Sequence, residues 1–117
     1  MEYDTEQMTI KMIKKQTDFK GKVVLEVGCG GGKISSILAN NTEQYIGIDS
    51  DIKAISEAKQ TYKNVDFRIG TGELLSFRDS RFNLVFFTLS LHHQNSSQAL
   101  KEAGRVLKKD GKLVILA

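Results

Sequence analysis

The sequence predicts an α/β fold in which helices cover both faces of a mostly parallel sheet. Along the chain, apolar residues alternate between the spacing of buried strands and the spacing of amphipathic helices. An apolar run at residues 22–27 ends in a cluster of glycines that leads into a helical pattern. The length of 117 residues, with 40% hydrophobic and 26% charged residues, fits one domain with its own core. We therefore expect a single domain over residues 1–117.

A short amphipathic helix is expected over residues 5–15, ahead of a core that spans residues 22–117. Met8, Met12 and Ile13 share one side of this helix in the predicted pattern. The first expected strand is the apolar run at residues 22–27, at the start of this core segment.

Helix and strand patterns continue to alternate after the glycine cluster. Apolar residues at i, i+3 and i+4 from Ile34 predict a helix that stops at residues 40–41. Residues 45–48 form the second expected strand, and residues 49–51 offer several N-cap side chains. The helix that follows ends near Asn64.

The second half of the chain contains three more expected strands. Residues 65–69 and 82–87 are the third and fourth, and residues 95–97 supply caps for the helix that follows. A turn at residues 110–111 leads into the fifth strand, residues 112–116. Because helices or long loops connect successive strands, we expect the strands to pair in parallel.

Composition excludes several classes of protein and function. The apolar runs are too short to cross a membrane, and the acidic start of the chain does not resemble a signal peptide. One cysteine excludes a disulfide scaffold, and we expect a cytoplasmic protein. A net charge of +3 does not call for nucleic acid, and we interpret the basic residues between positions 101 and 112 as a solvated face.

The glycine cluster is the strongest candidate for a ligand site. Residues 26–32 read E-V-G-C-G-G-G between a strand and a helix, where glycines let a ligand approach the backbone. The alternative is a tight strand-to-helix turn that needs only one or two glycines. A dinucleotide fingerprint, G-x-G-x-x-G, would place its last glycine where Lys33 stands. Glu26 would also repel a pyrophosphate but would suit an ammonium or sulfonium, so an NAD-dependent oxidoreductase is disfavoured.

These residues resemble the first motif of the class I S-adenosylmethionine-dependent methyltransferases, E/D-x-G-x-G-x-G. Residues 70–77 follow that family's third motif, with Thr71 in place of an acidic residue and Ser76 in place of proline. Residues 99–113 are similar to a segment of the type 11 branch, which includes ubiquinone and menaquinone C-methyltransferases. The resemblance implies a Rossmann-like sheet with strand order 3-2-1-4-5 and S-adenosylmethionine as the cofactor.

An acidic residue at the end of the second strand supports an adenosine-containing cofactor. The Asp49 carboxylate can accept both ribose hydroxyls, although NAD-binding domains share this feature. In the alternative interpretation Asp49 caps the next helix, a role open also to Ser50 and Asp51. From the resemblance we expect cofactor contacts from Glu26, Gly28, Cys29, Gly30, Gly32, Asp49, Ser50, Thr71, Gly72, Glu73 and Thr88.

Methyl transfer needs close alignment of donor and acceptor more than it needs a catalytic group. His92 and His93, after the fourth strand, are candidates for a general base, but lining the acceptor site is the favoured interpretation. The pair does not form a metal site, and Cys29 lacks the basic partner of a nucleophile. We expect a small-molecule acceptor, and the rival is a non-catalytic binding or regulatory module.

The family's sheet has seven strands, and we expect this chain to lack the last two. The fifth strand would then lie at an exposed, apolar sheet edge, which is a site of pairing or aggregation. A truncated chain, a second copy of the chain and a different partner chain all remain open as explanations.

Overall fold

The structure, a computed structural model, describes residues 5–88 and 95–116. It contains a five-stranded sheet with strand order β3-β2-β1-β4-β5, and every neighbouring pair is parallel, which confirms the predicted fold class. The elements, in chain order, are α1 (Thr5–Gln16), β1 (Val23–Val27), α2 (Lys33–Leu38), β2 (Gln44–Asp49), α3 (Ile52–Thr61), β3 (Asp66–Ile69), β4 (Phe82–Thr88), α4 (Ser96–Val106) and β5 (Leu107–Leu116).

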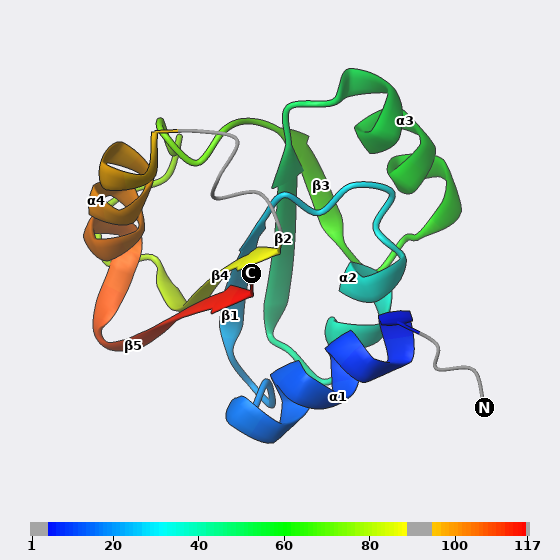
Figure 1. The fold of residues 1–117 in the computed structure, drawn as a ribbon, viewed down its shortest axis with the longest axis horizontal. Helices are drawn as coiled ribbons and strands as arrows, with labels where there is room; N and C mark the ends of the chain where they lie inside the picture. The colour runs from blue at the N-terminus through cyan, green and yellow to red at the C-terminus, as the bar shows by residue number, and fades with distance from the viewer. Residues whose placement is uncertain (1–4, 89–94, 117) are drawn as a thin grey trace.

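The winding of the chain reverses between β1 and β4. From β1 the chain moves outward through β2 to β3, with α2 and α3 as crossovers, and then returns to the other side of β1 as β4. Helices α1, α2 and α3 lie on one face of the sheet and α4 lies on the other (Figure 1). Ligands of open parallel sheets bind outside the carboxyl ends of the strands at such a reversal, so this arrangement specifies where to look for a site.

Two apolar cores lie on the two faces, because alternate side chains of a strand point in opposite directions. In β1, Val24 packs with Ile13, Leu38 and Ile55 under helices α1 to α3. On the other face, Leu25 packs with β4 and α4. All five residues of β1 are buried, as expected for a central strand covered on both faces.

Two details of the predicted elements differ in the structure. Ile13 is 1% exposed, but Met8 and Met12 are 46% and 52% exposed, so the buried side of α1 is not the predicted one. β5 is assigned from Leu107, earlier than predicted, but the predicted strand at residues 112–116 pairs in regular register with β4, and the expected turn at residues 110–111 falls within the register shift before it.

The outer edge of β5 has no neighbouring strand in the described part of the chain. Leu113 and Ile115 on this strand are 38% and 43% exposed. Among the described residues, no helix is long and apolar enough to cross a membrane.

Phe86 is fully buried in the core beneath α1 and α2, so its truncation tests this packing. Its ring meets those of Phe19 and Tyr45 edge to face, with centroids 6.1 and 6.2 Å apart. We expect Phe86→Ala to lower the free energy of unfolding by about 3–5 kcal/mol in urea denaturation. Met12→Ala should change it by less than about 0.5 kcal/mol, because Met12 is exposed. A large loss for Met12→Ala would contradict the packing of α1.

Candidate functional site

The glycine loop after β1 is fastened to the carboxyl end of β2. Gly28 N and Cys29 N both donate to Ile48 O, at 2.8 and 3.0 Å. Gly30 N donates to Asp49 Oδ2 at 2.8 Å. These three bonds fix the loop at the ends of β1 and β2, beside the reversal of the winding.

The glycines of the loop serve two different purposes. Gly30 and Gly32 have φ angles of 54° and 83°, a region that residues with a Cβ rarely adopt. A Cβ on Gly30 or Gly31 would have no described atom within 4 Å, so these positions face open space. A Cβ on Gly32 would lie 2.4 Å from Phe67 Cζ, so Gly32 is needed for packing. Gly30 and Gly31 therefore leave room for a ligand, whereas Gly32 lets α2 approach β3.

Asp49 is a connecting residue at the end of β2. Its Oδ2 accepts from Gly30 N, and its Oδ1 accepts from Asp51 N at 2.9 Å. Asp51, and not Asp49, caps α3, through a bond from Ala54 N. Each Asp49 oxygen keeps further accepting capacity, so the carboxylate can still receive hydroxyl donors from a ligand.

Glu26 is buried behind the loop, where hydroxyl groups from three elements surround its carboxyl. Ser35 Oγ and Tyr45 OH donate to Oε1 at 2.6 and 2.7 Å, and Thr88 Oγ1 lies 2.9 Å from Oε2. The side chain is 2% exposed. Glu26 therefore links β1 to α2, β2 and β4 at the edge of the candidate site.

Hydrogen-bond counting favours a proton on Glu26. The Thr88 hydroxyl lies 2.9 Å from Glu26 Oε2 and also 2.9 Å from Gly28 O, yet it has one proton to donate. A protonated Oε2 would donate to Thr88, which would then donate to Gly28 O. Burial raises the pKa of Glu26 and the nearby charge of Asp49 adds to this, while the three hydroxyl contacts act in the opposite direction.

Cys29 turns its side chain inward. The thiol packs against Gly47, where a Cβ would lie 3.2 Å from Sγ, and it belongs to the core beneath α2. Burial raises the pKa of the Cys29 thiol far above its usual range, with Glu26 and Asp49 as further causes. A thiol in this state is a poor nucleophile, so only the Cys29 backbone is available to a ligand.

The expected third-motif residues follow β3. Gly70 N donates to Asp49 O at 3.1 Å, which places the start of this segment beside the end of β2. Thr71 is exposed and bridges to Leu74, so Gly72 and Glu73 form a tight turn between them. Ser50 is exposed next to Asp49, and His92 and His93 lie outside the described residues.

Glu73 is engaged by α4. Its Oε1 accepts from Asn95 N at 2.9 Å, and its backbone oxygen accepts from Gln98 Nε2 at 3.2 Å. Asn95 caps α4 through a bond from Gln98 N. A cofactor contact from Glu73 therefore stays a prediction, because its carboxylate already has a partner.

Sequence reasoning missed several residues at this end of the sheet. Ser35 and Tyr45 were not singled out, since nothing in their spacing indicates that they meet Glu26. Ile52 and Ile69 are 67% and 56% exposed at the carboxyl ends of β2 and β3, and Ile69 pairs with Asp49. Large apolar residues at the carboxyl end of a predicted strand, or shortly after it, are the sequence signal that could have identified them.

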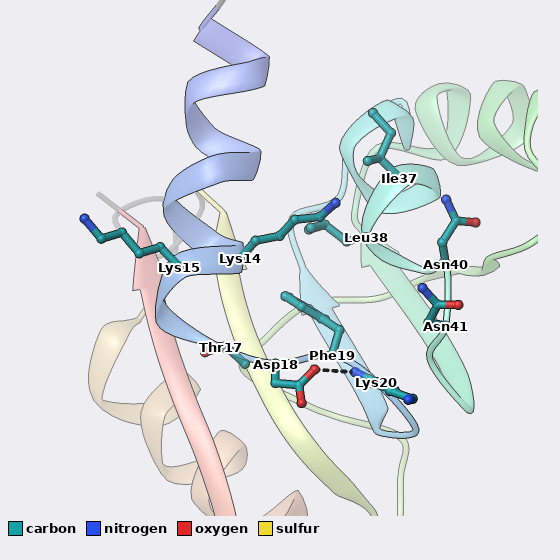
Figure 2. Close-up of a pocket in the computed structure, with 10 residues that line it drawn as sticks. All are labelled: Lys14, Lys15, Thr17, Asp18, Phe19, Lys20, Ile37, Leu38, Asn40 and Asn41. Carbon is teal, nitrogen blue, oxygen red and sulfur yellow. Dashed lines mark hydrogen bonds between the residues drawn. The ribbon is translucent and has the colours of Figure 1, made fainter.

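A cavity of about 640 Å³ lies at the opposite, amino end of β1 and β2. Lys14 from α1, Lys20 before β1, and Asn40 and Asn41 before β2 contribute to its wall (Figure 2). None of the predicted cofactor residues lines this cavity. The candidate site is instead the open surface over the glycine loop.

The fold and this surface define a class of protein. A glycine loop that is fastened to an acidic residue, at the reversal of a parallel sheet, is typical of α/β proteins that bind an adenosine-containing cofactor. A profile of the family described as "Methyltransferase domain" matches residues 25–115.

Curated relatives agree with this match. An uncharacterized methyltransferase of Schizosaccharomyces pombe is 33% identical over 94 residues, which are 80% of this chain and 38% of the relative. The ubiquinone biosynthesis O-methyltransferase of Coxiella burnetii is 33% identical over 109 residues, 89% of this chain and 47% of that enzyme. The chain thus spans less than half the length of these two relatives.

A solved structure shows the same fold. The YcgJ protein of Bacillus subtilis superposes with a TM-score of 0.86 at 26% identity, over 93% of this chain and 50% of that one. The chain belongs to the methyltransferase-domain family, and this membership indicates S-adenosylmethionine as its cofactor. The resemblance identified from the motifs is confirmed.

The buried carboxyl of Glu26 should make the stability of the fold depend on pH. Because folding raises the pKa of Glu26, the folded state holds its proton when the unfolded state has lost it. The resulting stability is fully present below the unfolded pKa and is lost as the pH rises through the folded pKa. Between the unfolded and the folded pKa of Glu26, each rise of one pH unit lowers the free energy of unfolding by up to about 1.4 kcal/mol.

Glu26→Gln removes the titration and preserves the hydrogen-bond pattern of the protonated acid. We expect this variant to gain stability relative to the wild type as the pH rises from 5 to 8, measured by urea denaturation. Arg105 lowers the pKa of Glu102, so Glu102 is ionised in both the folded and the unfolded state above about pH 5 and adds little slope over this range. Glu57→Gln, on the exposed side of α3, is the matched control. Parallel profiles for wild type and Glu26→Gln would contradict the prediction.

Proposed function

We propose that this chain binds S-adenosylmethionine over the glycine loop and takes part in methyl transfer to a small-molecule acceptor. The observation that carries the proposal is the bond from Gly30 N to Asp49 Oδ2. This bond holds the backbone of Gly30, which a ligand can approach, beside the Asp49 carboxylate. That carboxylate can still accept further hydrogen bonds. These are the two features that an adenosine with an adjoining charged chain requires.

The ribose would be held by Asp49. Its two oxygens each accept one backbone N–H, which fixes the carboxylate plane and leaves a lone pair on each oxygen for the vicinal hydroxyls. Ser50, exposed beside it, would lie at the rim. The backbone of Gly28, Cys29 and Gly30 would pack against the rest of the cofactor.

The adenine would lie over the ends of β2 and β3. Ile52 and Ile69 offer exposed apolar surface there, and burying it against a ring is favourable. Thr71 and Gly72 would border the ring, and the Thr71 hydroxyl can take part in a hydrogen bond. Because Thr71 stands where the family's third motif has an acidic residue, this contact would be weaker than a carboxylate would make.

The amino-acid end would lie toward β4. Glu26 and Thr88 are the polar side chains described on this side, and Thr88 is half-buried. Glu26, whose carboxyl is buried, would support this end of the ligand indirectly, by holding Thr88 and the elements around the loop in place. Gly32 supports the site indirectly by allowing α2 to pack on Phe67.

S-adenosylmethionine supplies a methyl group bonded to a positively charged sulfur. The task of this chain's residues is then to bind and orient, since a short, aligned approach accounts for much of the rate of such a displacement. His92 and His93, which follow β4 in the sequence, would line the acceptor side, and one of them would accept a proton where the acceptor must lose one.

Calorimetric titration with S-adenosylmethionine and S-adenosylhomocysteine tests the cofactor site. Asp49→Asn cannot accept from Gly30 N and from two ribose hydroxyls at once, so we expect affinity to fall about 10-fold to 100-fold. Asp51→Asn is the matched control: the same change two residues away keeps a good N-cap and should leave affinity within about twofold. Equal loss in both variants, or no binding to the wild type, would overturn the proposed site.

Turnover separates an enzyme from a binding module. A panel of small-molecule acceptors is incubated with radiolabelled S-adenosylmethionine, and transfer of label supports the enzyme. Tight binding with no transfer to any acceptor supports the non-catalytic alternative instead.

We also propose that the outer edge of β5 pairs with β5 of a second copy. The exposed Leu113 and Ile115 lie on a strand whose outer edge has no described neighbour, and a twofold axis would let the same edge serve both copies. Light scattering should then give a dimer, and Ile115→Lys should shift it to monomer. Met12→Lys, on the exposed side of α1, should leave the dimer intact. A monomeric wild type would overturn the pairing.

A further inference from the structure

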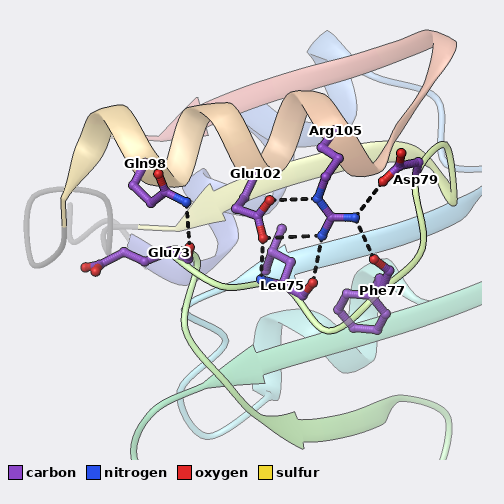
Figure 3. A network of polar contacts seen from close by, with 7 residues as sticks. All are labelled: Glu73, Leu75, Phe77, Asp79, Gln98, Glu102 and Arg105. Carbon is purple, nitrogen blue, oxygen red and sulfur yellow. Dashed lines mark hydrogen bonds and ion pairs between the residues drawn. The ribbon is translucent and has the colours of Figure 1, made fainter.

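The loop between β3 and β4 is held by side chains of α4, on the face of the sheet opposite to α2. Arg105 is the centre of this arrangement (Figure 3). Its Nη1 donates to Phe77 O and Asp79 Oδ1, and its Nη2 donates to Leu75 O, each at 2.8 Å. One guanidinium thus binds three separate points of the loop.

Glu102 completes the arrangement one turn earlier on α4. Its Oε2 accepts from Arg105 Nε at 2.7 Å, and its Oε1 accepts from Leu75 N at 2.9 Å. The residue is 8% exposed, so its charge is balanced by the guanidinium and not by water. Both backbone polar groups of Leu75 are therefore bound by this one pair of side chains.

Further bonds tie the two ends of the loop to the same helix. At the start, Glu73 binds Asn95 N and Gln98 Nε2, as described above. At the end, Ser80 N donates to Arg105 O at 3.0 Å and Arg81 N donates to Val106 O at 2.7 Å. The loop contains no helix or strand of its own beyond the Thr71–Leu74 bridge, so α4 determines its shape.

The sequence interpretation of Arg105 as part of a solvated basic face is therefore wrong. Lys101, Lys108, Lys109 and Lys112 are exposed, as that interpretation requires. Arg105 differs from them because Glu102, three residues earlier, meets it on the same side of α4.

We propose that Glu102 and Arg105 are positioning residues for the cofactor site, which they serve through the loop and without touching the ligand. Leu75 is 3% exposed and directly follows the Thr71–Leu74 bridge, which closes the turn at Gly72 and Glu73. With Leu75 fixed on both its N–H and its carbonyl, the turn is held beside Asp49 before a ligand arrives. A loop held in its bound shape loses less entropy on binding. The inference rests on the cofactor site proposed above.

Arg105→Lys tests the proposal because it keeps the positive charge but removes the planar guanidinium with its several N–H donors. A lysine ammonium cannot span Phe77 O, Leu75 O and Glu102 as the planar guanidinium does. We expect the dissociation constant for S-adenosylmethionine to rise about tenfold, as for the loss of charged hydrogen bonds. Hydrogen exchange of the Leu75 amide should also quicken, while amides of β1 should not change.

Arg78→Lys is the matched control, the same substitution at an exposed position of the same loop. It should leave both the dissociation constant and the Leu75 exchange rate within about twofold of the wild type. Glu102→Gln keeps an acceptor for Leu75 N but removes the charge. Its dissociation constant and its Leu75 exchange rate should lie between those of Arg78→Lys and Arg105→Lys. All titrations are made where urea denaturation shows each variant to be folded.

The possible results are distinguishable. Wild-type affinity in folded Arg105→Lys would overturn the positioning role, even if the variant unfolds at lower urea, because a purely structural role changes stability alone. Weaker binding together with faster Leu75 exchange supports it. If the wild type itself binds no S-adenosylmethionine, the proposed function fails and this inference fails with it.

Discussion

The buried carboxyl of Glu26 is the contact on which the candidate site depends. It lies at the carboxyl end of β1 and joins that strand to α2 through Ser35, to β2 through Tyr45 and to β4 through Thr88. Removing a carboxyl from water is costly, and the three hydroxyl groups offset part of that cost. The elements that border the glycine loop are therefore held together by a buried polar group with partners on three of them.

A second carboxylate, that of Asp49, connects the glycine loop to the start of α3 at the surface. It is half-buried and binds Gly30 of the loop and Asp51 at the start of α3. The two acids have different environments: the buried one holds elements together, and the partly exposed one keeps acceptor capacity at the surface. Their separation explains why the motif carries an acid before its glycines and a second acid after the next strand.

The other face of the sheet contributes to the same site through α4. Arg105 and Glu102 hold the loop after β3, which starts at the carboxyl end of the sheet beside Asp49. Two helices on opposite faces thus support one ligand surface. A parallel sheet makes this possible, because all its strands end at the same edge and connections from both faces meet there.

The alternation of strands and helices, the place of the glycine loop and the positions of the two acids follow from the sequence alone, because they depend on periodicity and on residue types at fixed spacing. The strand order came from the resemblance that these motifs carry. The sequence pattern misplaced the buried side of α1, where Met12 is exposed, and it misread Arg105 as solvated. Which side chains meet across elements, such as Tyr45 with Glu26 or Arg105 with Leu75, is seen only in the folded chain. Such pairs join residues 19 and 30 positions apart, and no local pattern encodes a contact that the packing of separate elements creates.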